Sequence, residues 1–343
     1  MNDLFEGKIL PWVDGQESDL NMSYSRLNVF ENCPKRYDLY YNQHKYGLDE
    51  STIALEVGSI CHKILELKAK AIMQHKPIDY DKLKTYLSEG FIGSNVDDED
   101  NILGIETIKK KYGIETWYEP DSEFRNYDEK ISLFKNKVVY NEVCDNGGDE
   151  FQWQTIACEE RFDFIYAVQT DLGLKRTHFL GYIDRIDSRV NDKSETEYRV
   201  VDYKTSKKAY SSKDTATALQ MCIYGMYVYL KYGVLPVEYL YSFVLINETQ
   251  TANTKGYEKR AIKKLDTLLT EIFMNTDRHE WNGKGTPLCY YCPYRVDSIL
   301  RDPIVGEECD EYCIWTPTNK TFERVNSDSC RPTVNKSKRT LCF

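Results

Sequence analysis

Hydrophobic and polar residues change their spacing several times along this chain. Apolar residues recur at helical intervals in four stretches, the first of which opens with a serine suited to cap a helix. Four other stretches alternate in polarity or are rich in β-branched and aromatic residues, as strands are. The pattern predicts helices over 23–47, 53–75, 217–233 and 256–275, and strands over 151–168, 177–190, 198–205 and 237–247.

Two further regions differ from these elements. Residues 77–150 are polar, charged and tyrosine-rich, contain short helical pieces and end in the turn sequence DNGGDE. We interpret them as a helical insertion. From residue 284 onward the chain is rich in cysteine and has little periodicity. The order of elements predicts an α/β or α+β core with helical additions, over 1–283, followed by a cysteine-rich region over 284–343.

Composition narrows the class of protein. The 343 residues are 41% hydrophobic and 29% charged, which is typical of a globular protein with a sizeable core. The chain has no apolar run of about eighteen residues, and its start lacks a basic segment followed by an apolar one, so we expect neither a membrane span nor an export signal. The net charge of −10 counts against a partner held only by a basic surface, but allows a nucleic-acid enzyme with a local basic groove.

An acid and a base stand two residues apart on the predicted strand 198–205. Because strand side chains alternate between faces, Asp202 and Lys204 share one face. Asp184, on the strand 177–190, comes near Asp202 if the two strands pair. Two carboxylates beside a lysine need a cation to offset their repulsion, and oxygen ligands of this kind suit Mg²⁺ or Mn²⁺. The alternative is an ordinary ion pair on a solvated face.

Two predicted helices carry polar residues one turn apart. Gly58, His62 and Glu66 form one stripe, and Gln220 and Tyr224 form another. Taken singly, such a histidine is more often structural than functional, and the glutamine and tyrosine would form a partly buried polar seam.

Taken together, these pieces resemble a known family. The motifs GxxxHxxLE, GYIDRID, DYK and QxxxY follow one another between about Ser23 and Pro293, with the region 77–150 skipped. This order resembles the RecB-like branch of the PD-(D/E)XK nuclease superfamily, which includes the RecB and AddB nuclease domains and the CRISPR-associated four-cysteine exonucleases. The resemblance implies a restriction-endonuclease-like core, with a mixed central sheet flanked by helices.

The resemblance also implies roles for single residues. Asp184 and Asp202 would be the metal-binding carboxylates, His62 would approach the same metal, and Lys204 would be the motif lysine that handles the attacking water. On the later helix, the pair Gln220 and Tyr224 would border the active site and the substrate.

A further acidic residue often lies on the preceding strand in this family. Here the sequence CEERF offers both Glu159 and Glu160. Adjacent strand residues point to opposite faces, so only one of the two can face the site, and the sequence leaves both open.

Eleven cysteines in a chain without a visible export signal are better read as core thiols or metal ligands than as disulfides. In relatives with an iron–sulfur cluster, one cysteine lies near the N-terminus and three near the C-terminus. Cys33, Cys289 and Cys292 match three of these positions, but Ser298 stands at the fourth. Cys309 or Cys313 could supply the missing thiolate of a four-iron four-sulfur cluster that joins the cysteine-rich region to the Cys33 segment. The alternatives are a structural Zn²⁺ on the later cysteines, or no metal.

We therefore expect a Mg²⁺- or Mn²⁺-dependent deoxyribonuclease, an exonuclease acting on single-stranded DNA or duplex ends. The alternatives are a non-catalytic nucleic-acid-binding adaptor and a structure-selective endonuclease on the same scaffold. A bacterial or phage-encoded protein of the cytoplasm, with a role in DNA repair or recombination, fits this expectation.

Overall fold

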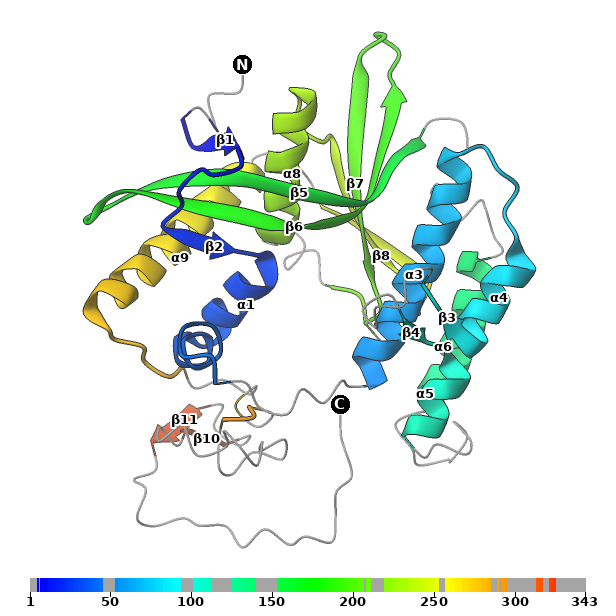
Figure 1. The fold of residues 1–343 in the computed structure, drawn as a ribbon, viewed down its shortest axis with the longest axis horizontal. Helices are drawn as coiled ribbons and strands as arrows, with labels where there is room; N and C mark the ends of the chain where they lie inside the picture. The colour runs from blue at the N-terminus through cyan, green and yellow to red at the C-terminus, as the bar shows by residue number, and fades with distance from the viewer. Residues whose placement is uncertain are drawn as a thin grey trace, which may run out of the picture. The chain divides into compact units, whose positions relative to one another are not determined.

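A mixed β-sheet flanked by helices forms the centre of the computed structural model, which confirms the predicted α/β architecture (Figure 1). The structure describes residues 5, 7–45, 53–93, 101–112, 125–139, 153–206, 208–210, 219–252, 257–284, 289, 292–294, 313–316 and 321–324.

The chain divides into two compact units. Unit 1 comprises Met1–Gln16, Ser51–Tyr166 and Phe179–Lys263, and unit 2 comprises Glu17–Glu50, Ala167–His178 and Lys264–Phe343. The expected division between residues 283 and 284 stays a prediction.

The central sheet has the strand order β1-β5-β6-β7-β8-β9, and β2 pairs with β6. The strands are β1 Ile9–Pro11, β2 Leu20–Met22, β5 Gln154–Thr170, β6 Gly173–Val190, β7 Thr196–Lys204, β8 Glu238–Phe243 and β9 Glu248–Ala252. The pairings of β1 with β5, β6 with β7 and β8 with β9 are antiparallel. The pairing of β7 with β8 is parallel and is bridged by a helix, as parallel neighbours require. The sequence pattern did not predict β9.

A group of helices in unit 1 covers one face of the sheet (Figure 1). It consists of α3 Ile53–Met73, α4 Tyr80–Glu89, α5 Ile105–Lys111, α6 Arg125–Leu133 and the π-helix η3 Phe134–Val139, with a two-stranded ribbon of β3 Gly90–Phe91 and β4 Ile102–Leu103. Buried Ile60 and Ile64 of α3 join Leu83, Ile108 and Phe134 in one hydrophobic cluster. The described part of 77–150 is therefore largely helical, and its apolar residues complete the core around α3.

The helix α8, Leu219–Tyr232, packs on the opposite face. Leu240 of β8 belongs to the cluster on the α3 side, so its neighbour Tyr239 points to the other face. There a Cβ added at Gly225 would lie 2.1 Å from the Tyr239 hydroxyl. Only glycine permits so close an approach, and it sets the position of α8 over the sheet.

Unit 2 contains α1 Tyr24–Asn32, α2 Pro34–Tyr37, the π-helix η1 Asp38–Asn42 and a ribbon of β10 Cys313–Thr316 and β11 Thr321–Arg324. The helix α9, Tyr257–Arg278, carries residues of both units. Ser23 caps α1 by accepting a hydrogen bond from the Arg26 backbone, as expected. The predicted helix 23–47 is interrupted at Cys33, because Pro34 restricts the residue before it and starts a new helix. Among the described helices, none has the length and apolar character needed to cross a bilayer.

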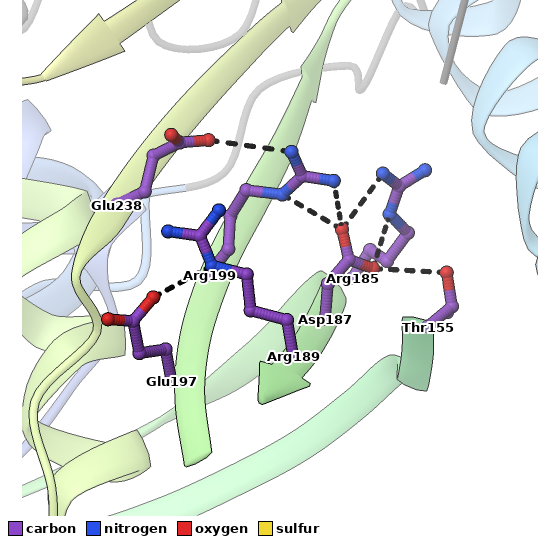
Figure 2. A network of polar contacts seen from close by, with 7 residues as sticks. All are labelled: Thr155, Arg185, Asp187, Arg189, Glu197, Arg199 and Glu238. Atoms are coloured by element: carbon purple, nitrogen blue, oxygen red, sulfur yellow. Dashed lines mark hydrogen bonds and ion pairs between the residues drawn. The ribbon is translucent and has the colours of Figure 1, made fainter. Parts of the chain in front are cut away.

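A buried ionic network joins β5, β6 and β7 on the α3 side of the sheet (Figure 2). Asp187 lies 2.9 Å from Arg185 Nε and accepts hydrogen bonds from Arg199 at 3.0 and 2.6 Å and from Thr155 at 3.0 Å. The side chains of Asp187, Arg185 and Arg199 are almost fully buried. At the more exposed end of the network, Arg189 pairs with Glu197, and Glu238 lies 3.5 Å from Arg199. Two arginines therefore depend on one buried carboxylate.

We predict that Asp187→Asn lowers the free energy of unfolding by about 3–5 kcal/mol, because it removes the buried negative charge that two buried guanidinium groups share. The two arginines hold the pKa of Asp187 below its usual range against the opposing effect of burial. Chemical denaturation of the purified variant measures the loss. The matched control is Glu197→Gln, which removes the charge of a less buried partner of Arg189 and should cost less than about 1 kcal/mol. Equal effects of the two changes would contradict the prediction.

Candidate active site

The strands β6 and β7 stop pairing where the predicted acids begin. Their ladder runs from Val190↔Thr196 to Arg185↔Val201, and the next residue of each strand is Asp184 and Asp202. The Asp184 carboxylate accepts a hydrogen bond from the Tyr203 backbone N–H at 2.6 Å, in place of a backbone carbonyl. The parting of the strands therefore leaves both carboxylates at one end of the ladder.

A histidine and two acids converge at this point. Ligand atoms of His62, Glu159 and Asp184 all lie within 4.8 Å of one another, and His62 Nδ1 is 3.7 Å from Asp184 Oδ1. His62 comes from α3, Glu159 from β5 and Asp184 from β6. The structure thus brings together two of the three predicted metal ligands and adds Glu159.

Glu159 adopts a left-handed backbone conformation, with φ of 46°. On its two sides the strand does not alternate regularly: Cys158 lies beside the backbone of Glu66 in α3, whereas Glu160 contacts Tyr227 and Lys231 of α8. Residues two apart share a face in a regular strand, so Glu159 breaks the alternation. This irregularity turns Glu159 toward His62 and Asp184, and it answers which of the two glutamates faces the site.

The third predicted ligand, Asp202, pairs with the motif lysine. Asp202 Oδ2 lies 2.5 Å from Lys204 Nζ, which also donates to Gln220 Oε1 at 2.9 Å. Gln220 in turn donates to the Tyr224 hydroxyl at 2.8 Å. A continuous polar chain therefore runs from β7 to α8 and connects four of the residues singled out in the sequence.

The third member of the α3 stripe, Glu66, does not reach the ligand group. Its carboxylate pairs with Lys63 at 2.9 Å and with Lys70 on the same helix. The ion pairs offset the effect of burial and hold the pKa of Glu66 below its usual value.

Burial raises the pKa values of all three acids around the site. The pKa of Glu159 rises to about 7, through burial and the neighbouring Asp184. Burial likewise raises the pKa values of Asp184 and Asp202 to about 6, although Lys204 acts in the opposite direction on both. Burial lowers the pKa of His62, so that neutral imidazole, the metal-binding form, is favoured. Although burial disfavours its charge, Lys204 keeps a raised pKa because of Asp202.

The donor set fits a divalent cation. The three carboxylates repel one another when all are ionised, and the neutral imidazole beside them adds no positive charge. A bound cation would offset this repulsion. Carboxylate oxygens are the ligands preferred by Mg²⁺ and Mn²⁺. The residues that could hold such an ion are His62, Glu159, Asp184 and Asp202.

A cavity of about 360 Å³ opens beside this group. The side chains of His62 and Glu159 line it together with Thr205 and the first turns of α3. A Cβ added at Gly58 would lie 3.2 Å from the Thr205 hydroxyl, so the glycine keeps this wall of the cavity open.

Cys33, Cys289 and Cys292 lie in unit 2, apart from the residues described above. Burial raises the pKa of the Cys292 thiol, and Cys33 and Cys289 are close enough to raise it further. Cys309 lies outside the described residues, and only the backbone of Cys313 is described. No disulfide joins the cysteines whose side chains are described, which are Cys33, Cys61, Cys158, Cys222, Cys289 and Cys292.

The sequence profile of the PD-(D/E)XK nuclease superfamily matches residues 21–296, which is most of the chain. This chain belongs to the PD-(D/E)XK nuclease superfamily. The match confirms the predicted family and includes every residue placed at the site above.

Two relatives are similar over part of this PD-(D/E)XK chain. Each is named as one of the subunits of an ATP-dependent helicase/deoxyribonuclease. The Clostridium tetani protein is 26% identical over 206 residues, which are 60% of this chain and 17% of the relative. The protein of Clostridium perfringens strain SM101 is 26% identical over 224 residues, which are 64% of this chain and 18% of the relative. The similarity therefore spans less than a fifth of the length of these relatives.

We predict that Glu159→Gln stabilises the metal-free protein at neutral pH. A carboxyl whose pKa rises from 4.5 unfolded to about 7 folded destabilises the fold as pH increases through that window. Because the side chain is partly exposed, we expect a gain on the order of 1 kcal/mol, or ~2–4 °C in melting temperature. Thermal melts in EDTA between pH 5 and 8 measure it, and the gain should vanish near pH 5.

The neighbouring Glu160→Gln is the matched control. Lys231 and Tyr227 hold the pKa of Glu160 below its usual value despite burial, so its loss should destabilise slightly or have no effect. With Mn²⁺ added, the wild type should gain more in melting temperature than Glu159→Gln does. A Glu159→Gln protein that is less stable than the wild type in EDTA at pH 8 would contradict the assignment.

Proposed function

We propose that this chain is a divalent-metal-dependent deoxyribonuclease that acts as an exonuclease on single-stranded DNA or on duplex ends. The main support for this proposal is that two sets of residues lie close together where β6 and β7 stop pairing. One set is the ligand group of His62, Glu159 and Asp184, and the other is the pair Asp202 and Lys204. The names of the relatives, which contain the word deoxyribonuclease, favour DNA as the substrate.

In this proposal, Asp184, Asp202, Glu159 and His62 hold Mg²⁺ or Mn²⁺. The bound ion would polarise the phosphodiester and lower the pKa of a water molecule, so that hydroxide forms near neutral pH. The ligands come from α3 and three strands, so the fold, rather than one local motif, fixes their geometry.

Lys204 provides a positive charge next to Asp202. Its ammonium group is held in place by Asp202 and by Gln220, whose own side chain is held by Tyr224. A positioned cation of this kind can orient the attacking water and stabilise the negative charge that develops on the phosphate. Gln220 and Tyr224 thus act as positioning residues for Lys204, and the cavity beside His62 and Glu159 offers room for the substrate strand.

We predict that the purified protein degrades labelled DNA in Mg²⁺ or Mn²⁺ and stops in EDTA. Asp202→Ala and Lys204→Ala should each lower the rate at least about a hundredfold, since each removes a group that acts on the reacting atoms. Gel analysis of end-labelled single- and double-stranded DNA measures the rates.

Lys208→Ala is the matched control, because it makes the same change at an exposed lysine beyond the end of β7 and should leave the rate unchanged. A covalently closed circular substrate separates the exonuclease from an endonuclease, which would cut it. DNA binding without cleavage under any divalent ion would refute the enzyme and favour an adaptor.

We also propose that Cys33, Cys289 and Cys292 bind a four-iron four-sulfur cluster with Cys309 or Cys313. Cys33 and Cys289 both act electrostatically on Cys292, which supports a common site. The segments around them share unit 2, where Lys284 donates to the Glu31 carbonyl at 2.8 Å and Tyr294 donates to the Lys45 carbonyl at 2.9 Å. A structural Zn²⁺ is the competing occupant.

We predict that protein purified without oxygen is brown and contains about four iron and four sulfide per chain, as this cluster requires. Cys33→Ser should lose most of the iron and the visible absorption that the cluster gives. The control Cys158→Ser replaces a free, half-buried thiol of unit 1 and should retain both. Zinc in place of iron, or no metal at all, would refute the cluster without affecting the nuclease proposal.

A further inference from the structure

The second half of the motif GYIDRID, with Arg185 and Asp187, has no role in the proposed chemistry. Both side chains belong to the buried ionic network of Figure 2, and strand alternation places them on the face opposite to Asp184. We propose that this network positions the metal ligands, and that Arg185 and Tyr203 transmit its rigidity to His62 and Asp184. The inference rests on the proposed function, because it concerns the ligands of the same site.

Tyr203 touches the candidate ligands from two directions. Its backbone N–H donates to the Asp184 carboxylate at 2.6 Å, and its ring meets the His62 ring edge to face, with centroids 6.1 Å apart and an angle of 86°. Tyr203 is 4% exposed and belongs to the hydrophobic cluster around α3. One residue therefore restrains both the carboxylate of β6 and the imidazole of α3.

The hydroxyl of Tyr203, at the far end of the ring from the backbone, is held by Arg185. Arg185 donates to it at 2.9 Å, and the guanidinium carbon lies 5.8 Å from the centre of the ring. Arg185 is itself fixed by Asp187, with Nε 2.9 Å from Oδ1 and Nη2 3.0 Å from Oδ2. A planar guanidinium held at two points has little freedom to move, so the tyrosine hydroxyl has a fixed partner.

The other contacts of Asp187 fix the network within the sheet. Thr155 binds one carboxylate oxygen from β5, and Arg199 binds the other from β7. On its far side, Arg199 lies over the ring of Trp153, at 4.7 Å from the centroid. The network thus joins the three strands that carry Glu159, Asp184 and Asp202, directly behind the point where β6 and β7 part.

Such support matters because the ligands repel one another. In the absence of a cation, crowding of Glu159, Asp184 and Asp202 favours movement of one carboxylate away from the others. A rigid Tyr203 opposes that movement for Asp184 and keeps His62 oriented toward it. Groups that hold metal ligands in this way commonly contribute about 10–100-fold to metal affinity.

The test compares Tyr203→Phe with wild type, since this change keeps the ring and removes only the hydroxyl to which Arg185 donates. Titration calorimetry with Mn²⁺ alone should show a Kd about tenfold higher, with the melting temperature in EDTA lowered by no more than a few degrees. Arg185→Lys, which cannot hold Asp187 and Tyr203 together, should raise the Kd at least as much. At saturating Mn²⁺ the cleavage rate of Tyr203→Phe should return to near that of the wild type.

Two matched variants separate positioning from general stability. Tyr198→Phe makes the same change on the same strand, where the ring stacks on Tyr232, and should leave the Mn²⁺ Kd unchanged. Glu238→Gln weakens the exposed end of the network at Arg199 and should lower stability slightly without altering metal affinity.

A second readout needs no metal. The protein has five histidines, so the imidazole signals of His62 can be assigned in nitrogen-15 spectra by its absence in His62→Gln. Tyr203→Phe should shift or broaden the His62 signals in EDTA, and Tyr198→Phe should not.

A Tyr203→Phe protein with wild-type Mn²⁺ affinity and unchanged His62 signals would overturn the inference. A wild-type protein that binds no Mn²⁺ and cleaves no DNA would instead refute the proposed function, so the two failures are distinguishable.

Discussion

Mutual repulsion of buried carboxylates is the constraint on which this structure depends. Glu159, Asp184 and Asp202 approach one another at one end of the β6–β7 ladder, and burial raises the pKa values of all three. Left to itself, such a cluster would take up protons or spread apart. Two contacts hold the acids in place: the Tyr203 backbone N–H donates a hydrogen bond to Asp184, and Lys204 forms an ion pair with Asp202. A bound cation would offset the repulsion that remains.

Strand β6 carries two buried carboxylates, Asp184 and Asp187, whose surroundings shift their pKa values in opposite directions. On one side of the sheet, the single carboxylate of Asp187 pairs with two arginines, which hold its pKa below the usual range. A short way along the strand, the carboxylate of Asp184 shares its surroundings with other acids and its pKa rises. The first arrangement balances acid against base within the protein, whereas the second is where we propose that an ion binds. The short motif Asp-Arg-Ile-Asp therefore contains both a structural and a chemical centre.

Much of this organisation could be predicted from the sequence. The hydrophobic period located α3, β7 and α8, and it placed Asp202 with Lys204 on one strand face and Gln220 with Tyr224 on one helix face. The approach of Asp184 to Asp202 was predicted only on the condition that the strands 177–190 and 198–205 pair, and they do pair. These features follow from local spacing, which a single sequence contains.

Other features depend on contacts that local spacing does not record. The choice of Glu159 over Glu160 depends on a left-handed residue within a strand, which strict alternation excludes. The proposed role of Tyr203 depends on its contact with Arg185, which lies on a neighbouring strand. The short strand β9 is polar, so its pairing with β8 could not be recognised from its hydrophobicity. Each of these cases is settled by tertiary packing and not by propensity.

The parallel pairing of β7 with β8 has a consequence for how the residues of the candidate site come together during folding. The hairpins of β5, β6 and β7 join neighbours in the chain, but β8 can align with β7 only after the intervening segment has crossed the sheet and α8 has docked. That crossing also delivers Gln220 to Lys204. We therefore expect the docking of β8 and α8 to complete the surroundings of Lys204 in one non-local step of folding, so that a chain halted before it would lack the Gln220 contact to the Lys204 ammonium group.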